Sequence, residues 1–317
     1  MIKNIVVLIP VNEQQKILLE NKAPFAKFTY TDSKHVQLEQ IKNANIIIGN
    51  PPAFMLNSCN DLQFLQLQSA GANEYASLNV LKEEVLLATA NGAYGLAISE
   101  YMVGVVLELY KKLHLYRDNQ NKKEWSNLGE VKSIYNSTAL IVGLGDIGGE
   151  FAKRIKALGG YTIGIRRKDC NKPDYLDELY LMDKLTELLP RADIVSLSLP
   201  ETNLTKNIIN EKTLKLMKKD AVIINVGRGS AIDTDALCNA LEKEQLLGAA
   251  LDVTEPEPLL SNHPLWNMKN VIITPHISGG FSLKETHERI VTICANNLEA
   301  FLNDKKVINI VNRIEGY

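Results

Sequence analysis

The chain has 317 residues, of which 45% are hydrophobic and 23% charged, and its formal net charge at pH 7 is −2. This length favours two domains, and the near-neutral charge argues against nucleic acid or an anionic membrane as a partner. The apolar run at residues 5–9 is too short for a signal peptide or a membrane span, and the four cysteines form no C-x-x-C pair. We therefore expect a cytoplasmic protein that binds neither a membrane nor nucleic acid.

The first part of the chain alternates between strand and helix patterns. Short strands are predicted at residues 5–8, 26–29, 46–48, 64–68 and 85–88. The stretches between them are polar and have helical spacing, for example residues 33–42. Such alternation predicts a mostly parallel sheet with helices on both faces.

A long apolar helix is predicted next, over residues 95–116. Its apolar side chains include Leu96, Ile98, Val103, Val105, Val106, Leu109 and Leu113. A helix this apolar is expected to be buried between domains or between subunits, so we predict a homodimer formed through the domain that contains it. The polar stretch that follows, residues 119–123, is expected to be an exposed loop.

A second alternating run begins at residue 139. Strands are predicted at residues 139–142, 161–165, 194–197, 222–225, 249–251 and 272–273, and helices at 147–158, 184–189 and 233–241. A last helix, over residues 283–302, follows the completed second sheet, so we expect it to pack on the first domain. The predicted fold is α/β with two doubly wound parallel-sheet domains, residues 1–94 plus 281–317 and residues 95–280, with the active site in the cleft between them.

The turn after the strand at 139–142 has the pattern G-x-G-x-x-G. It follows an apolar strand and opens a helix, which is the context that a dinucleotide site requires. The first glycine allows a tight turn, the second lets the backbone approach the diphosphate, and the third lets helix and strand pack closely. Free N–H groups and the positive end of the helix then face the phosphates. The predicted cofactor residues here are Gly143, Gly145, Asp146, Ile147 and Gly148.

The end of the next strand carries basic residues where NAD sites usually carry an acid. Residues 161–165 are followed by Arg166, Arg167 and Lys168. An NADP site places arginine at this point because the guanidinium matches the oxygens of the 2′-phosphate. The alternative is that these are solvated charges at a strand end. We predict that Arg166 and Arg167 contact the cofactor, with NADP preferred and NAD as the alternative.

Three later segments place polar residues just beyond strand ends. Arg228 follows the strand at 222–225, acids including Glu257 follow that at 249–251, and His276 follows the last strand. In an open parallel sheet, ligands bind outside the carboxyl ends of the strands, so all three segments should meet the glycine turn. Reduction of a 2-oxo acid needs an arginine for the carboxylate, a histidine that delivers the proton and a carboxylate that orients the histidine. A lone His276 would be interpreted as an ordinary loop histidine, but Arg228 and Glu257 favour a catalytic role.

Taken together, the motifs resemble the D-isomer-specific 2-hydroxyacid dehydrogenases. The matching stretches are residues 68–73, 90–100, 143–148, 225–229, 251–258, 263–266 and 274–279. The resemblance implies a flavodoxin-like substrate domain and a Rossmann dinucleotide-binding domain, in a short form without a regulatory domain, similar to glyoxylate and hydroxypyruvate reductases. It also implies that His276 is the acid/base, that Glu257 pairs with it, and that Arg228 binds the substrate.

Further contacts are implied by the same resemblance. Backbone N–H groups of Ala70, Gly71 and Ala72 would hold the substrate carboxylate, and Asp252 would meet the nicotinamide carboxamide. The remaining implied cofactor contacts are Leu199, Pro200, Thr205, Val226, Gly227 and Gly279. No metal site is expected.

Three other functions compete with an oxidoreductase acting on a small 2-oxo or 2-hydroxy acid. One of them, a phosphoglycerate dehydrogenase, stays open only in its short form, because the chain has no room for a regulatory domain. A nucleotide-sensing corepressor on the same scaffold can retain the same triad, so the residues alone leave it open, and turnover would separate the two. A formate dehydrogenase would call for glutamine in place of Glu257 and is rejected. The identity of the 2-oxo acid does not follow from these motifs.

Overall fold

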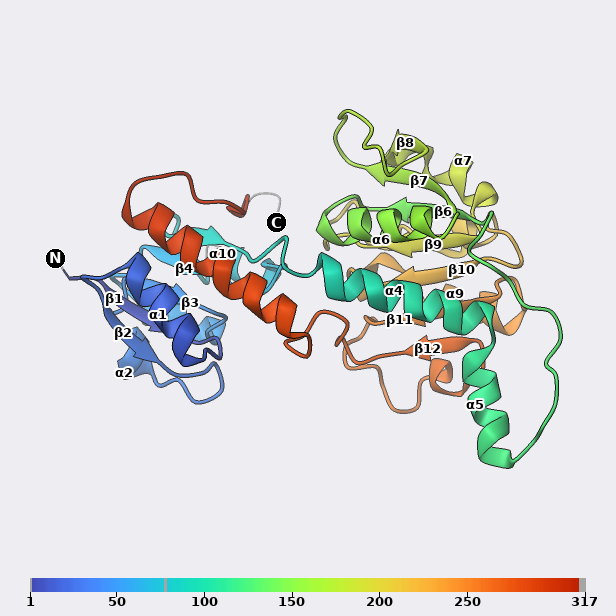
Figure 1. The fold of residues 1–317 in the computed structure, drawn as a ribbon, viewed down its shortest axis with the longest axis horizontal. Helices are drawn as coiled ribbons and strands as arrows, with labels where there is room; N and C mark the ends of the chain where they lie inside the picture. The colour runs from blue at the N-terminus through green and yellow to red at the C-terminus, as the bar shows by residue number, and fades with distance from the viewer. Residues whose placement is uncertain (1, 77–78, 314–317) are drawn as a thin grey trace. The chain divides into compact units, whose positions relative to one another are not determined.

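The computed structural model describes residues 2–76 and 79–313, and the chain forms two compact units, residues 1–94 with 281–317 and residues 95–280 (Figure 1). The first unit contains a five-stranded sheet in the order β2-β1-β3-β4-β5, in which every neighbouring pair is parallel. Its strands are β1 (Asn4–Val7), β2 (Lys27–Tyr30), β3 (Ile46–Ile48), β4 (Phe64–Gln66) and β5 (Leu86–Ala88). This is the strand order of flavodoxin-like folds.

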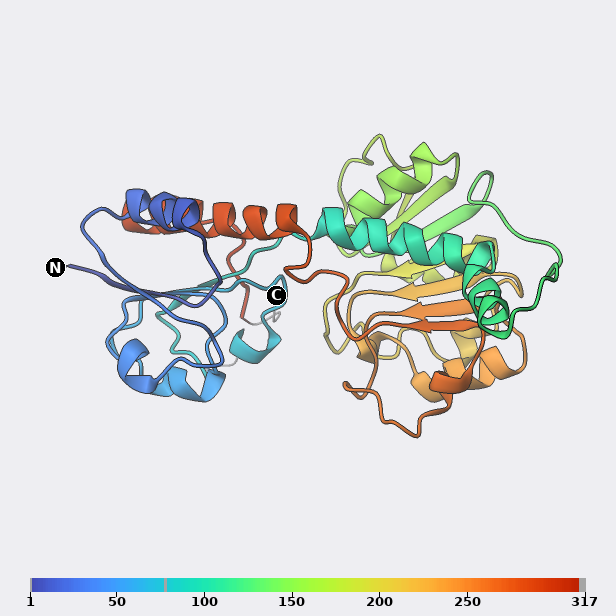
Figure 2. The same ribbon diagram turned by 60° about the horizontal axis from the view of Figure 1, so that its bottom comes forward.

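Helices cover both faces of this first sheet, as Figure 2 shows. On one face lie α1 (Glu13–Lys22) and α10 (Lys284–Leu302), which pack against each other. On the other face lie α2 (Leu38–Ile41), the 3-10 helix η1 (Ala53–Ser58) and α3 (Asn73–Ala76). Successive side chains of a strand point to opposite faces, so Ile5 and Val7 join the core under α10 whereas Val6 joins the other. The last helix of the chain, α10, therefore packs on the first sheet.

The second unit is built on a seven-stranded parallel sheet in the order β12-β11-β10-β9-β6-β7-β8. The strands are β6 (Thr138–Val142), β7 (Tyr161–Arg166), β8 (Glu178–Leu181), β9 (Ile194–Leu197), β10 (Val222–Asn225), β11 (Gly248–Leu251) and β12 (Val271–Ile273). The order reverses between β6 and β9, which is the topological switch point of a Rossmann fold. The predicted fold class is confirmed.

Two layers of helices enclose this second sheet. On one face, α4 (Gly95–Tyr110) and α6 (Asp146–Ala157) lie side by side. On the other face lie α7 (Leu185–Leu188), α8 (Glu211–Leu214) and α9 (Thr234–Glu242). The helix α6 forms where it does because Phe151 and Ile155 recur at helical spacing and are fully buried. Among the described residues, no helix is long and apolar enough to cross a membrane.

The structure corrects the predicted helix over residues 95–116. The helix α4 ends at Tyr110, and a separate helix α5 (Leu113–Lys122) starts after Lys112, whose φ is +57°. The buried apolar face that packs α4 on the sheet ends at Tyr110, and α5 has no buried residue. Packing against the sheet therefore does not keep the two segments in one straight helix. The prediction of a loop at residues 119–123 was also wrong, because α5 extends to Lys122.

Two smaller corrections have local causes. The predicted helix at residues 33–42 is reduced to α2, because the side chain of Asp32 accepts hydrogen bonds from the N–H groups of Lys34 and His35 and forms a turn. The edge strand β8 was missed because it is only four residues long and none of them is buried, although Leu179, Tyr180 and Leu181 are apolar or aromatic.

Candidate active site

The parallel sheet of the second unit brings the predicted site segments to the carboxyl ends of its strands, which form its carboxyl edge. The glycine turn follows β6, Arg166 ends β7, and Arg228, Asp252 and His276 follow β10, β11 and β12. Close packing joins several of these turns. The Ser198 hydroxyl donates to the Gly143 carbonyl oxygen at 2.8 Å, and a Cβ on Gly227 would lie 2.6 Å from the backbone of Leu199. The carboxyl edge is therefore a continuous surface of loops.

The glycine turn has the shape that a dinucleotide diphosphate requires. Gly143 has a φ of +101°, which side chains rarely adopt, and a Cβ on Gly148 would overlap the Gly143 carbonyl oxygen. A Cβ on Gly145, by contrast, would meet nothing within 4 Å, so the backbone is open to a ligand at the start of α6. The first N–H groups of this helix have no intrahelical partner. The residues present therefore fit a bound diphosphate.

The carboxylate of Asp146 is hydrogen-bonded within the protein. Its Oδ2 accepts a 2.6 Å hydrogen bond from the backbone N–H of Gly95, the first residue of α4. A carboxylate aimed at the diphosphate would repel it, and this bond holds the side chain on α4 instead. The contribution of Asp146 and Ile147 to a cofactor would then come from their N–H groups.

His276 and Glu257 are brought together by two different loops. The Nδ1 atom of His276 lies 2.6 Å from Glu257 Oε1, and both side chains are about half exposed. Because a carboxylate can only accept, Nδ1 is the donor in this contact, and Nε2 takes no part in it. The backbone of His276 has a φ of +52°, in the left-handed region, where histidine is tolerated at some cost.

The loop that carries His276 is anchored on Asp252. The carbonyl oxygen of Asp252 accepts from the His276 N–H at 2.8 Å. Its carboxylate, which is 1% exposed, accepts from the N–H groups of Ile277 and Ser278 and from the Thr274 and Ser278 hydroxyls. In the structure this carboxylate anchors the histidine loop, and the contact with the nicotinamide carboxamide that the resemblance implied stays a prediction.

Arg228 lies on a turn that is clamped by Asn225. The buried Asn225 side chain donates to the Arg228 carbonyl oxygen at 2.8 Å and accepts from the Gly227 N–H at 3.1 Å. The Arg228 guanidinium donates to the Gly227 carbonyl oxygen. A Cβ on Gly229 would overlap the Thr254 carbonyl oxygen, so this turn packs against the loop that leads to Glu257. The arginine and the glutamate therefore come from adjoining loops.

The loop after β9 is held by its own hydroxyl groups. Thr205 Oγ1 donates to the Pro200 carbonyl oxygen at 2.7 Å and accepts from the Thr202 N–H at 2.9 Å. The side chains of Leu199 and Val226 are buried. Thr205 shapes this loop, and Gly279 lies half-buried at the end of the histidine loop.

A cavity of about 390 Å³ opens beside the end of β7. Its lining includes Arg166, Lys172 and Lys184, together with the acids Asp169 and Asp183. The guanidinium of Arg166 donates to Cys170 Sγ, and Arg167 also has an interaction partner. The basic residue predicted to select the cofactor thus faces an open cavity.

The segment from Ala70 to Ala72 follows β4 in the first unit. Asn50, at the end of β3, accepts from the Gln68 N–H at 3.0 Å and donates to the Ser69 hydroxyl, which donates to the Gly71 carbonyl oxygen. Asn50 thereby fixes the backbone ahead of Gly71. No group of His, Cys, Asp and Glu side chains that could hold a metal ion occurs in the described part of the chain.

Several residues that support the site had no assigned role in the sequence. Asn225, Thr274 and Ser278 lie within matching motifs, so their positions gave a signal, although their partners did not. Tyr101 lies in an apolar helix and gave none. Its hydroxyl reaches Thr274 at 2.8 Å, across 173 positions of the chain.

Comparison with known proteins identifies the family. The model of the D-isomer specific 2-hydroxyacid dehydrogenase, NAD binding domain, matches residues 103–278. A glyoxylate reductase from Thermofilum pendens is 31% identical over 269 residues, which cover 82% of this chain and 78% of that protein. The chain therefore belongs to the D-isomer specific 2-hydroxyacid dehydrogenases, a family of oxidoreductases, as its motifs predicted.

Solved structures share this fold over nearly the whole chain. A D-isomer specific 2-hydroxyacid dehydrogenase family protein from Aeromonas salmonicida superposes with a TM-score of 0.88 at 27% identity, covering 99% of this chain and 100% of that one. An NADPH-dependent glyoxylate/hydroxypyruvate reductase from Sinorhizobium meliloti, in complex with NADP and sulfate, gives 0.84 at 23% identity, with coverages of 99% and 100%. The second likeness shows the fold. These relatives lend no support to the corepressor alternative.

Proposed function

We propose that this protein reduces a small 2-oxo acid to the D-2-hydroxy acid with NAD(P)H, and catalyses the reverse oxidation. The observation that carries the proposal is the 2.6 Å contact between His276 Nδ1 and Glu257 Oε1 at the carboxyl edge of the sheet. A histidine held in this way has one nitrogen fixed and the other free for proton transfer. The same edge carries a glycine turn shaped for a dinucleotide.

Each residue of the proposed triad has one task. When bound, the nicotinamide would supply the hydride to C2 of the substrate, or accept it from C2 in the reverse reaction. His276 Nε2 donates a proton to the oxygen on C2, and Glu257 stabilises the charged ring before that transfer. Arg228 pairs with the substrate carboxylate and polarises the carbonyl group. Hydride and proton together convert the 2-oxo acid to the 2-hydroxy acid, and the reverse reaction returns the proton to His276.

Substrate and cofactor contacts complete the proposal. The N–H groups of Ala70, Gly71 and Ala72 would hold the carboxylate, and Asn50 keeps that backbone in place. The diphosphate would lie on the glycine turn, flanked by the loop from Leu199 to Thr205 and by Val226, Gly227 and Gly279. Glyoxylate and hydroxypyruvate are the first substrates to test, since the related enzymes are named for them.

NADP is the proposed preferred cofactor. The cavity beside β7 carries Arg166, Lys172 and Lys184 around the position expected for the 2′-phosphate, against two acids. A guanidinium can bind that phosphate through charge-assisted hydrogen bonds, whereas the acid common at this strand end in NAD sites would repel it.

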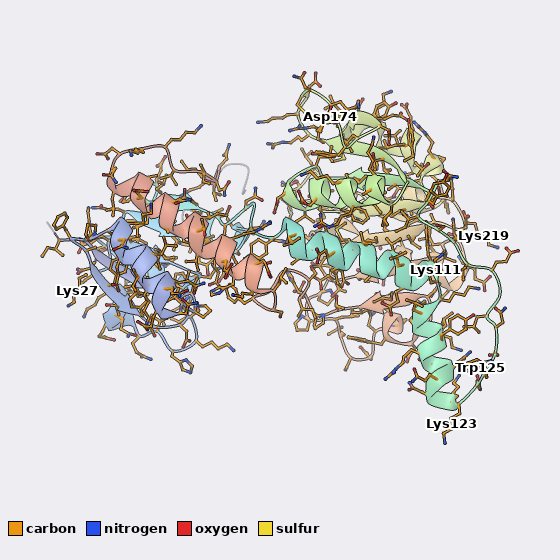
Figure 3. All side chains as sticks on the ribbon, viewed as in Figure 1. Lys27, Lys111, Lys123, Trp125, Asp174 and Lys219 are labelled. Carbon is orange, nitrogen blue, oxygen red and sulfur yellow. The ribbon has the colours of Figure 1, made fainter. Side chains whose placement is uncertain are left out.

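A homodimer is the proposed assembly. The apolar side chains of α4 are mostly buried in the protein's own core, so they do not form the subunit interface that the sequence suggested. Exposed apolar side chains lie further along, on α5 and the segment after it: Leu113, Trp125, Val131 and Tyr135. Trp125 is fully exposed beside α5 (Figure 3). Tryptophan is typical of interface centres, so this segment is where a second copy would bind.

Turnover tests the proposed reaction. The purified protein should oxidise NADPH or NADH in the presence of at least one of glyoxylate, hydroxypyruvate, phenylpyruvate or a branched 2-oxo acid, and the product should be the D-isomer. Cofactor binding without turnover of any of these acids would overturn the enzyme assignment and favour a nucleotide-sensing protein.

Sedimentation tests the assembly separately. Trp125→Asp should convert a dimer to a monomer, whereas Phe25→Asp, at an exposed aromatic residue of the other unit, should leave the dimer intact. A wild-type monomer at micromolar concentration would rule the dimer out.

A further inference from the structure

The histidine loop is connected to helix α4 by a chain of hydrogen bonds. The Tyr101 hydroxyl lies 2.8 Å from Thr274 Oγ1, and Thr274 Oγ1 lies 2.6 Å from Asp252 Oδ1. Asp252 then accepts from the N–H groups of Ile277 and Ser278, the two residues after His276. A residue of α4 is thus connected, through two side chains, to the loop that carries the proposed acid/base.

The direction of each bond in this chain follows from its last member. The Asp252 carboxylate accepts from the N–H groups of Ile277 and Ser278, and the Thr274 hydroxyl donates to it as well. Thr274 Oγ1 can then only accept from Tyr101, whose hydroxyl is the donor. Burial raises the pKa of Tyr101 to about 12, so its hydroxyl keeps its proton over any ordinary working pH. Every hydrogen bond in the chain therefore has a defined direction.

This chain of hydrogen bonds matters because it ends at a strained, half-exposed loop. His276 has a left-handed backbone, and its ring is about half exposed, so packing does little to hold it. The buried carboxylate of Asp252 fixes the segment, and that carboxylate needs donors in definite directions. Thr274 is one of those donors, and Tyr101 restricts the rotation of the Thr274 hydroxyl by occupying its acceptor side.

We propose that Tyr101 is a positioning residue for the reaction, which acts through Thr274 and Asp252 to keep His276 on Glu257. Its kinetic consequence rests on the proposed function, whereas its effect on the loop does not. A small displacement of a proton donor lowers the rate of the chemical step much more than it lowers substrate binding.

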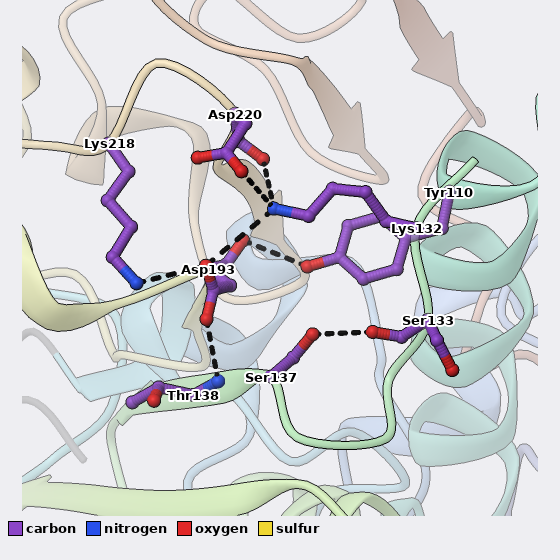
Figure 4. A network of polar contacts seen from close by, with 8 residues as sticks. All are labelled: Tyr110, Lys132, Ser133, Ser137, Thr138, Asp193, Lys218 and Asp220. Carbon is purple, nitrogen blue, oxygen red and sulfur yellow. Dashed lines mark hydrogen bonds and ion pairs between the residues drawn. The ribbon is translucent and has the colours of Figure 1, made fainter. Parts of the chain in front are cut away.

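The kinetic test compares two tyrosines of the same helix. Tyr101→Phe should lower kcat roughly ten-fold, equivalent to about 1.4 kcal/mol, with the KM of the 2-oxo acid and the Kd of the cofactor unchanged. Tyr110→Phe is the matched control, because its hydroxyl donates to the Asp193 carbonyl oxygen at 3.2 Å, at the opposite edge of the sheet (Figure 4). It should lower thermal stability and leave kcat intact. Wild-type kcat in Tyr101→Phe would overturn the positioning role.

Thr274 offers a rescue experiment. Thr274→Val keeps the shape and removes both hydrogen bonds, so it should reduce kcat more than Tyr101→Phe does. Thr274→Ser retains the hydroxyl and should restore most of the activity. Equal losses in the valine and serine variants would show that the methyl group, rather than the hydroxyl, is what matters, and would overturn the proposed chain.

Hydrogen exchange tests the loop without relying on activity. The amides of Ile277 and Ser278 should exchange faster in Tyr101→Phe than in the wild type, and at the wild-type rate in Tyr110→Phe. Unchanged exchange in Tyr101→Phe would overturn the proposal whatever the kinetics show. Faster exchange in a protein that turns over no 2-oxo acid would support the anchoring chain and reject the proposed function alone.

Discussion

The two edges of the seven-stranded sheet hold their charged groups in opposite ways. At the amino edge, Asp193 accepts from Lys218 at 3.0 Å and from the Thr138 N–H at 2.8 Å, and Lys132 bridges it to Asp220 (Figure 4). At the carboxyl edge, Glu257 and His276 share one contact and are half exposed. Opposite charges neutralise each other within the first cluster, whereas the second keeps a free ring nitrogen.

This difference separates stability from chemistry. A carboxylate with two ammonium partners and a backbone donor has little capacity left for a ligand, so the amino edge ties loop ends and strand starts together. A half-exposed histidine with one nitrogen held by a carboxylate can offer its other nitrogen to a ligand. Substitutions at the carboxyl edge should therefore change turnover at nearly constant stability, and substitutions at the amino edge should do the reverse.

The largest expected effect is that of His276→Ala. Loss of general acid catalysis should lower kcat by roughly 10²–10⁴-fold and leave the Kd of the cofactor unchanged. The measurement is steady-state turnover with cofactor binding followed by fluorescence. His35→Ala, at an exposed histidine of the first unit, is the control and should be silent. Near-normal turnover of His276→Ala would reject the assignment.

Arg228→Ala should come next. The arginine acts on the substrate carboxylate in the ground state and on the carbonyl oxygen in the transition state, so KM should rise and kcat should fall together. Loss of one charge-assisted contact predicts a decrease of kcat/KM of roughly ten- to a hundredfold. A change in neither constant would remove Arg228 from the site.

Cofactor choice should change by a similar or smaller factor. One good contact between Arg166 and the 2′-phosphate predicts a preference of roughly ten- to a hundredfold for NADPH, and Arg166→Asp should reverse it. The measurement is the ratio of kcat/KM values with NADPH and NADH at a fixed 2-oxo acid. Lys184→Gln, at another cation that lines the same cavity, should reduce the preference without reversing it. An NADH preference in the wild type would show that Arg166 is only a surface charge.

At the amino edge, Asp193→Ala should lower stability and spare activity. It removes the acceptor for Lys218, for Lys132 and for the Thr138 N–H, and should cost about 1–3 kcal/mol of unfolding free energy. Denaturant unfolding should show this loss, with kcat unchanged. A variant with normal stability and impaired turnover would contradict the division between the two edges.

The smallest expected effect is a pH-dependent one, at Glu178. The Arg191 guanidinium, followed by the hydroxyls of Tyr180 and Tyr161, lowers the pKa of Glu178 from 4.5 to about 2. A lowered pKa means that the pair stabilises the fold above pH 4.5 and that this contribution is lost as the pH falls toward 2. Because Arg191 is partly exposed, the contribution is about 1 kcal/mol or less.

Glu178→Gln tests this sign directly. The variant should be less stable than the wild type at pH 7, and the difference measured by urea unfolding should shrink as the pH is lowered through the window from 4.5 to 2. A difference that is the same at pH 7 and at pH 3 would contradict the ionic origin.

Short-range patterns were sufficient for most of the fold and for the proposed triad. The alternation of strands and helices predicted both sheets, and parallel strands must present their carboxyl ends at one edge, so residues after strand ends could be expected to meet. Arg228, Glu257 and His276 were predicted in this way, each from a few neighbouring residues. The glycine turn was recognised because a strand precedes it and a helix follows it.

Contacts between distant segments were decided by the tertiary structure alone. The break after Tyr110 depends on where the core beneath α4 ends, and the Asp252 carboxylate turns to residues 22 to 26 positions away along the chain. Tyr101 meets Thr274 only because α4 packs over β10 and β11. A hydrogen bond has a range of about 3 Å and leaves no periodic trace in the residues between its partners. The sequence alone therefore determines the strands, the helices and the kinds of residue at their ends, and the packing of those elements decides which of these residues touch.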